Sequence, residues 1–143
     1  MCAAVPAPFA HELRVRFGEC DPQGIVFNAN YLLYFDVAIT ELWREAGCPW
    51  QELVERGVEA VVAETNIRFL APAVFDDVIE LQATVAQVGT TSITTEIDAV
   101  RDGDPLVRGT LRHVCIDTRT REKTPVPEWL RESLGRYSAE QLV

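Results

Sequence analysis

Residues 29–46 read ANYLLYFDVAITELWREA. In a helix built from this stretch, apolar side chains cover most of the circumference, and a polar stripe recurs every fourth residue at Asp36, Thr40 and Arg44. Gly47 and Pro49 follow as stop signals, so the pattern predicts a helix of about 18 residues. A helix this apolar must be buried on several sides, with only a narrow face reaching solvent or a partner.

Most of the chain around this helix is typical of β-strands. Apolar and polar residues alternate, or β-branched residues gather, in the runs 13–17, 61–70, 79–85, 92–100 and 106–116, with a short helix predicted at 49–56. The predicted order is one strand, the long helix and then a four-strand meander. This predicts an α+β fold in which a curved antiparallel sheet of about five strands wraps around a long central helix.

Length and charge limit what the chain can be. Its 143 residues fit a single domain, 1–143, with loose ends at about 1–8 and 138–143. The formal net charge is −9 and the basic residues are scattered, which argues against a nucleic-acid-binding surface. A single sheet of this kind has open edges, so we expect a homodimer or a homotetramer built as a dimer of dimers.

The four cysteines are far apart and form no C-x-x-C pair, which favours free thiols in a reducing compartment over a zinc site or a disulfide scaffold. No apolar run approaches the roughly 20 residues of a membrane span, and no secretory signal is evident. We therefore expect a cytoplasmic protein without membrane contact. No sequence motif predicts a metal or a nucleotide cofactor.

A short turn leads into the long helix and carries a carboxylate. Residues 17–31 read FGECDPQGIVFNANY, in which Pro22 fixes a backbone dihedral angle, Gly24 permits close approach and Asn28 is a good helix N-cap. The first N–H groups of the helix can hold an oxyanion, because they lack partners and carry the positive end of the helix dipole. Asp21 can then attack or deprotonate, or it can simply satisfy backbone donors in the turn.

The segment from Phe17 to Val26, followed by Asn30-Tyr31, resembles the hotdog-fold acyl-CoA thioesterases of the 4-hydroxybenzoyl-CoA thioesterase type. The resemblance extends over roughly residues 13–134 and includes the segments 69–72 and 76–77. It implies the hotdog fold and hydrolysis of a thioester between an acyl group and coenzyme A or a pantetheine-bearing carrier. Coenzyme A would be part of the substrate, and no cofactor is implied.

The resemblance places the family's catalytic aspartate at Asp21, as a nucleophile that forms a mixed anhydride or as a general base for water. It places the backbone amide that polarises the carbonyl at Asn28. Gly24 would let the substrate approach the turn, and Phe27 and Tyr31 would line the acyl pocket. For these two aromatic residues a place in the core is the alternative.

The segment 89–92 matches a region where relatives contact the nucleotide part of coenzyme A. Thr91 and Ser92 are therefore predicted substrate-binding residues, although β-propensity alone also explains them. Because this turn carries no Arg or Lys, Arg68, Arg101 and Arg108 are alternative donors to the diphosphate. Asp36 is either part of a solvated helix face or subunit contact, or a partner for a polar acyl substituent.

Other reactions fit the sequence less well. There is no G-x-S-x-G motif, and His11 and His113 have no obvious Ser or Cys partner. Glu41 and Glu45 lie near the C-terminus of the predicted helix, far from the amides at its start. Two alternatives to acyl-CoA hydrolysis stay open: a thioesterase acting on an acyl-carrier protein, and a non-catalytic acyl-CoA-binding module of the same fold.

Overall fold

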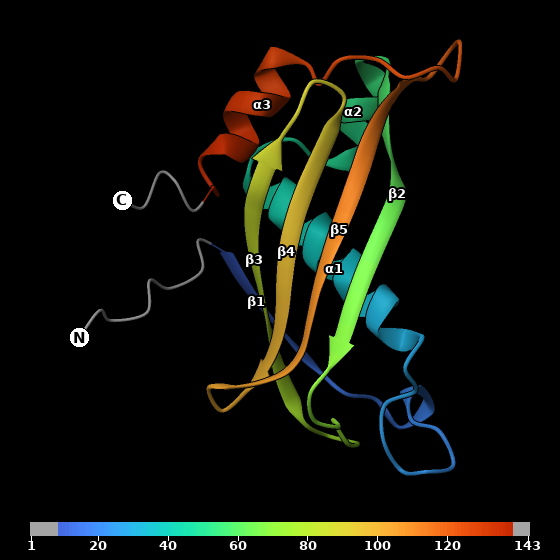
Figure 1. Ribbon diagram of the computed structural model, residues 1–143, viewed down its shortest axis with the longest axis vertical. Coiled ribbons are helices and arrows are strands. Elements are labelled where there is room, and N and C mark those ends of the chain that lie inside the picture. The colour runs from blue at the N-terminus through green and yellow to red at the C-terminus, as the bar shows by residue number, and fades with distance from the viewer. Residues whose placement is uncertain (1–8, 139–143) are drawn as a thin grey trace, which may run out of the picture.

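The computed structural model describes residues 9–138, which form a curved five-stranded antiparallel sheet with a long helix packed across one face (Figure 1). The predicted loose ends, 1–8 and 138–143, lie outside the described residues except for Ser138. In chain order the elements are β1 (Phe9–Arg14), a 3-10 helix (Phe17–Glu19), α1 (Asn30–Glu45), α2 (Trp50–Glu55), β2 (Val58–Phe69), β3 (Val78–Val88), β4 (Ser92–Arg101), β5 (Asp104–Asp117) and α3 (Glu128–Gly135).

Helix α1 confirms the predicted central helix, one residue shorter at each end. Phe35, Ala38 and Leu42 are completely buried between the helix and the sheet. Burying a large apolar side chain stabilises a fold by about 1.5–3 kcal/mol, so this face anchors the molecule. The helix is not enclosed on all sides, however, because Leu33 is 62% exposed and Leu32 is 44% exposed.

The sheet order is β1-β3-β4-β5-β2, which corrects the predicted four-strand meander. Only β3, β4 and β5 follow one another as neighbours, while β2 pairs with β5 at the far edge. The segment 70–77 carries the chain past the end of the sheet to β3, and the N–H groups of Leu70 and Ala71 donate to the carbonyl of Leu106 on the way. Strands β1 and β2 are thus the two edges.

Three local predictions also need correction. The first strand is Phe9–Arg14 rather than 13–17, because the chain turns into the 3-10 helix, where Glu19 Oε1 accepts the Arg16 N–H at 2.7 Å. The predicted alternation of apolar and polar side chains along β2 is interrupted by a β-bulge between Val62 and Glu64, where the pairing register with β5 shifts. Helix α3, which the sequence analysis did not predict, packs Leu130 and Leu134 into the core.

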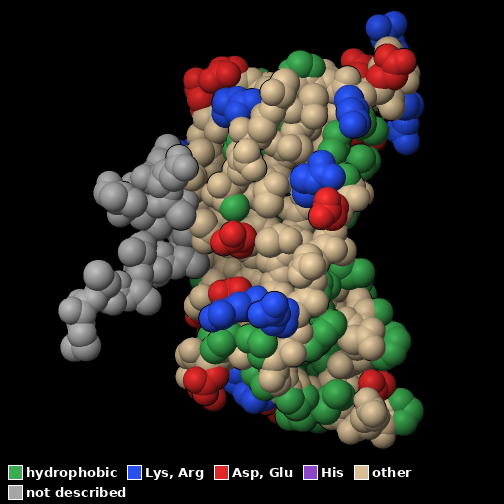
Figure 2. Space-filling view, viewed as in Figure 1, with side chains coloured by type: hydrophobic (Ala, Val, Ile, Leu, Met, Phe, Trp, Pro, Cys, Tyr) green, Lys and Arg blue, Asp and Glu red, His purple; other side chains and the backbone are tan. Residues whose placement is uncertain are grey.

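The outer face of the sheet is mainly polar. Figure 2 shows Lys, Arg, Asp and Glu side chains scattered over it, with hydrophobic side chains gathered toward its lower part. Cys20, Cys48 and Cys115 are free thiols, as predicted, and Cys2 lies outside the described residues. Within residues 9–138 no helix is long and apolar enough to cross a membrane, and no three His, Cys, Asp or Glu side chains cluster as metal ligands would.

Candidate functional site

A groove of about 440 Å³ lies where the turn before α1 meets the end of β2, and we call it the Asp21 groove. One wall comes from the turn and the start of α1, and the other from the apolar residues at the end of β2 and just after it. Its lining residues are Asp21, Gln23, Ile25, Val26, Asn28, Tyr31, Phe69, Leu70, Ala71 and Pro72.

Asp21 is held by its own turn. Its Oδ1 accepts the Gln23 N–H at 2.7 Å, its carbonyl oxygen accepts the Gly24 N–H at 2.9 Å, and its N–H donates to the Ile25 carbonyl at 2.9 Å. No group within residues 9–138 donates a hydrogen bond to Asp21 Oδ2. The carboxylate is therefore fixed through one oxygen and free to act through the other.

Gly24 serves the conformation of this turn. Its φ is +80°, a region that side chains disfavour, and a Cβ added there would meet nothing within 4 Å. The predicted glycine is thus needed for the backbone path. Close approach of a substrate to Gly24 stays a prediction, because Gly24 does not line the groove.

Three hydrogen bonds tie the turn to the rest of the fold. Asn30 Nδ2 donates to the Glu19 carbonyl at 2.7 Å, and Tyr34 Oη donates to Glu19 Oε1 at 3.0 Å. The Val26 N–H donates to the Ala73 carbonyl at 2.9 Å. Burial and the neighbouring Glu19 carboxylate raise the pKa of Tyr34, so its hydroxyl remains a donor. These contacts fix Asp21 relative to the start of α1.

The predicted N-cap at Asn28 is wrong, because Ala29 occupies that position and no side chain caps the helix. The chain turns earlier than expected: the Asn30 N–H donates to the Phe27 carbonyl at 2.9 Å, and the Tyr31 N–H to the Asn28 carbonyl at 3.2 Å. Within the described residues the N–H groups of Asn28 and Ala29 donate to no protein group. They are unsatisfied donors at the positive end of α1.

The two aromatic residues predicted for the acyl pocket differ in their exposure and in their place relative to the groove. Tyr31 lines the groove but is only 3% exposed, and its ring packs edge-on against Phe69 with centroids 5.7 Å apart. Burial raises its pKa. Phe27 is 47% exposed and is not a lining residue. Tyr31 thus lies in the core and also lines the groove, while contact of either aromatic residue with an acyl group stays a prediction.

Thr91, in the connection from β3 to β4, and Ser92, the first residue of β4, lie at the other end of the sheet (Figure 1). One chain therefore does not bring them to the Asp21 groove. A basic residue that was not predicted for this turn contacts it: Arg131 of α3 donates to the carbonyls of Val88 at 2.9 Å and Gly89 at 2.7 Å. No local signal reveals this contact, because α3 follows much later in the chain.

The three arginines considered for the diphosphate have different surroundings. Arg101 is paired with Asp77 Oδ2 at 2.6 Å and donates to the Pro72 carbonyl at 3.3 Å, so it supports a wall of the groove. Arg68 and Arg108 line a hollow elsewhere on the sheet. In this hollow Arg108 Nε lies 3.8 Å from Asp98 Oδ2. None of the three lines the groove itself.

Residues just after β2 form a wall of the groove. They belong to the segment 69–72 of the family likeness, but the sequence did not predict them as site residues. Leu70 is 47% exposed although it is large and apolar. The apolar run FLAPAVF at 69–75, just where a strand ends, was the available signal. This wall lies beside Asp21 because an isolated antiparallel β-bridge joins Ile25 to Val74, and the sequence does not reveal that bridge.

Comparison with known proteins gives a consistent result. The sequence profile described as the thioesterase-like superfamily matches residues 15–134. The acyl-CoA thioesterase YbgC of Haemophilus influenzae is 30% identical over 110 residues, which cover 76% of this chain and 81% of that protein. The 4-hydroxybenzoyl-CoA thioesterase of Pseudomonas sp. is 35% identical over 77 residues, covering 52% and 55%. A solved thioesterase-superfamily structure from Jannaschia sp. matches with a TM-score of 0.88 at 25% identity, covering 96% and 98%.

Proposed function

The chain belongs to the thioesterase-like superfamily and has its hotdog fold, and we propose that it hydrolyses an acyl-CoA thioester with Asp21 as the catalytic carboxylate. The observation that carries the proposal is that Asp21 and Asn28 line the same groove. A carboxylate with one free oxygen and a pair of unsatisfied N–H groups are the two parts that acyl transfer requires. The names of the related proteins support coenzyme A as the carrier.

In the proposed reaction the Asn28 N–H donates to the thioester carbonyl oxygen, where negative charge grows in the transition state. Asp21 either attacks the carbonyl carbon, which releases the coenzyme A thiolate and leaves a mixed anhydride, or takes a proton from the attacking water. In the first case water then hydrolyses the anhydride and restores Asp21. Both routes give a free acid and coenzyme A without a cofactor.

The decisive test is the release of free thiol from a panel of acyl-CoA and acyl-carrier-protein thioesters by the wild type and Asp21→Asn. We expect kcat/KM to fall by at least ~100-fold in the variant, because it removes an essential acid–base or nucleophilic group. The matched control is Asp102→Asn, in the turn between β4 and β5, which should hydrolyse the panel normally. Unchanged turnover in Asp21→Asn would falsify the assignment.

The panel also separates the alternatives. Preference for the carrier-protein thioesters would favour the carrier-protein reaction, and binding of acyl-CoA without any thiol release would favour the non-catalytic module. Rapid-quench mass spectrometry of the wild type distinguishes the two roles of Asp21. An acylated Asp21 peptide identifies the nucleophile, and its absence at all quench times identifies the general base.

We further propose that two copies of the chain pair along β2. This edge strand has 12 residues, and it exposes Val61 (41%), Val62 (51%) and Phe69 (53%). A long edge strand that exposes apolar side chains among its polar ones favours strand addition by a second copy. A dimer of such dimers stays a prediction.

The three free thiols of the described residues support a reducing compartment, and we propose the cytoplasm.

A further inference from the structure

The segment 70–77, between β2 and β3, is held by one partly buried ion pair. Arg101, the last residue of β4, donates from Nη1 to Asp77 Oδ2 at 2.6 Å and to the Pro72 carbonyl at 3.3 Å. Asp77 Oδ2 also accepts the Val74 N–H at 2.9 Å. Two side chains therefore hold the segment at three places along its length.

The Arg101–Asp77 pair is more buried than the other ion pairs of residues 9–138. Its side chains are 33% and 19% exposed, whereas each other pair has at least one side chain that is 48% exposed or more. Loss of hydration offsets much of the attraction in such a pair, so its net contribution to stability is small, but its hydrogen bonds fix the geometry of the groups that they join. The pair is therefore better suited to hold a position than to stabilise the fold.

The segment 70–77 in turn holds the turn that carries Asp21. An isolated antiparallel β-bridge joins Val74 of the segment to Ile25 of the turn. The Ile25 carbonyl accepts the Asp21 N–H at 2.9 Å. A series of contacts therefore leads from Arg101, through the segment, to the backbone of Asp21.

The same segment forms a wall of the Asp21 groove, because Leu70, Ala71 and Pro72 line it. A shift of the segment would therefore change both the position of the Asp21 carboxylate and the surface beside it. Reaction rates are sensitive to such shifts, since a misplacement of ~1 Å can cost about 100-fold.

We propose that Arg101 and Asp77 are positioning residues of the hydrolysis. Through the segment 70–77 they hold Asp21 at the place from which its carboxylate reaches a thioester bound at the Asn28 N–H. This role rests on the proposed function of Asp21, and in it neither Arg101 nor Asp77 touches the substrate. It differs from diphosphate contact, for which the sequence makes Arg101 a candidate.

The test compares kcat and KM of the wild type, Arg101→Gln and Asp77→Asn. The substrates are the acyl-CoA that the wild type hydrolyses fastest and the pantetheine thioester of the same acyl group, which lacks the nucleotide and the diphosphate. The matched control is Arg44→Gln, which removes an arginine from an ion pair with Glu41 near the other end of α1. Circular dichroism at the assay temperature checks that each variant is folded, and Asp77→Asn, which keeps the shape of the side chain, carries the test if Arg101→Gln does not fold.

We expect Arg101→Gln to lower kcat by about 10- to 100-fold, by the same factor for both thioesters and with KM changed by less than ~3-fold, because the carboxylate is misplaced while substrate contacts remain. Asp77→Asn should act in the same direction. The double variant should be within about 2-fold of the slower single variant, since the two residues act as one unit. Arg44→Gln should hydrolyse both thioesters like the wild type.

Two results would overturn the positioning role. An unchanged kcat in folded Arg101→Gln would mean that the pair only supports the segment, and a higher KM for the acyl-CoA alone would mean that Arg101 binds the diphosphate. Asp21→Asn is measured beside these variants. Normal turnover in Asp21→Asn would contradict the proposed function, whereas slow turnover there together with normal turnover in Arg101→Gln would contradict only the positioning role.

Discussion

His113 lies on β5, in the core beneath α1, with its ring centroid 5.7 Å from that of Trp43. Burial lowers its pKa from the usual 6.5, and the facing Asp36 charge opposes this shift without reversing it. Between the lowered pKa and about 6.5 the unfolded chain therefore binds more protons than the folded protein, and stability rises with pH. The stability that the neutral, buried His113 contributes is complete above pH 6.5, and it is lost as the pH falls through the pKa of His113 in the folded protein.

We expect His113→Phe to flatten the dependence of the free energy of unfolding on pH below about 6.5, because phenylalanine fills the site without titrating. Urea unfolding at a series of pH values measures this. The comparison of the two proteins at pH 8, where the imidazole is neutral in both states, gives the packing effect of the substitution separately. A slope identical to that of the wild type would show that His113 is not the titrating group.

At the level of single residues, the sequence was informative where the relevant neighbours are close in the chain. Asp21, Gly24 and Asn28 were predicted together because one turn contains them, and they lie at or beside one groove. The pairing of Trp43 with His113 was not predictable, because it depends on which strand lies beneath α1. The Asn28 N-cap failed for a local reason, since the chain begins to turn at Phe27.

At the level of elements, Gly109 sets how closely α1 approaches the sheet. A Cβ at this position of β5 would clash with the ring of Phe35 and lie 2.8 Å from the Asn66 carbonyl oxygen. Neither neighbour can yield easily, because Phe35 is completely buried and the carbonyl belongs to the β2 backbone. Gly109→Ala should therefore lower the free energy of unfolding by about 2–3 kcal/mol, as overpacking does.

Urea denaturation monitored by circular dichroism checks this value. The control is Gly18→Ala, because a Cβ there meets nothing within 4 Å and the backbone is not in the left-handed region. The control should stay within about 0.5 kcal/mol of the wild type. Equal stability of the two variants would mean that α1 can move away from β5 at little cost.

Element types were predictable from periodicity, whereas pairing was not. The apolar pattern of 29–46 specifies a helix whatever surrounds it, and α1 follows this pattern closely. The choice of β5 rather than β3 as the neighbour of β2 is made by the path of segment 70–77 around the end of the sheet. Helix α3 was missed because its 8 residues show too short an apolar pattern.

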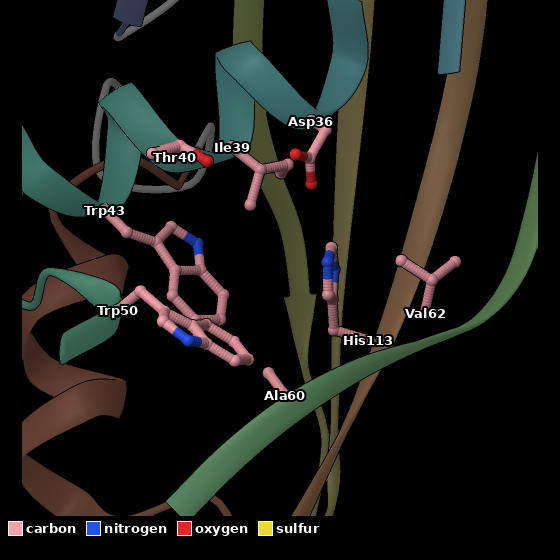
Figure 3. A pocket seen from close by; sticks show the side chains of 8 residues that line it. All are labelled: Asp36, Ile39, Thr40, Trp43, Trp50, Ala60, Val62 and His113. Atoms are coloured by element: carbon pink, nitrogen blue, oxygen red, sulfur yellow. The ribbon is translucent and has the colours of Figure 1, made fainter. Parts of the chain in front are cut away.

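At the level of the whole molecule, the proposed pairing of two copies would cover apolar surface that one chain leaves open. Leu33, Val37 and Val62 are exposed on α1 and β2, although they are large and apolar. Antiparallel pairing of two β2 edges would bring the Phe69 end of one chain beside the Val58 end of the other. The Asp21 groove of one copy would then face the pocket that Ala60 and Val62 line in the other copy (Figure 3), because the two sites include opposite ends of β2.

Thr65 tests this arrangement, because it is exposed near the middle of β2. In a symmetric antiparallel pair its two copies lie close to the two-fold axis, so Thr65→Glu places like charges together and should weaken the dimer by at least ~10-fold. Thr65→Val is the matched control, because both variants lose the hydrogen bond from Thr65 Oγ1 to the Thr110 carbonyl at 3.0 Å. Sedimentation velocity over a concentration series should show dissociation of the glutamate variant alone. A monomeric wild type, or equal dissociation of both variants, would exclude pairing through this edge.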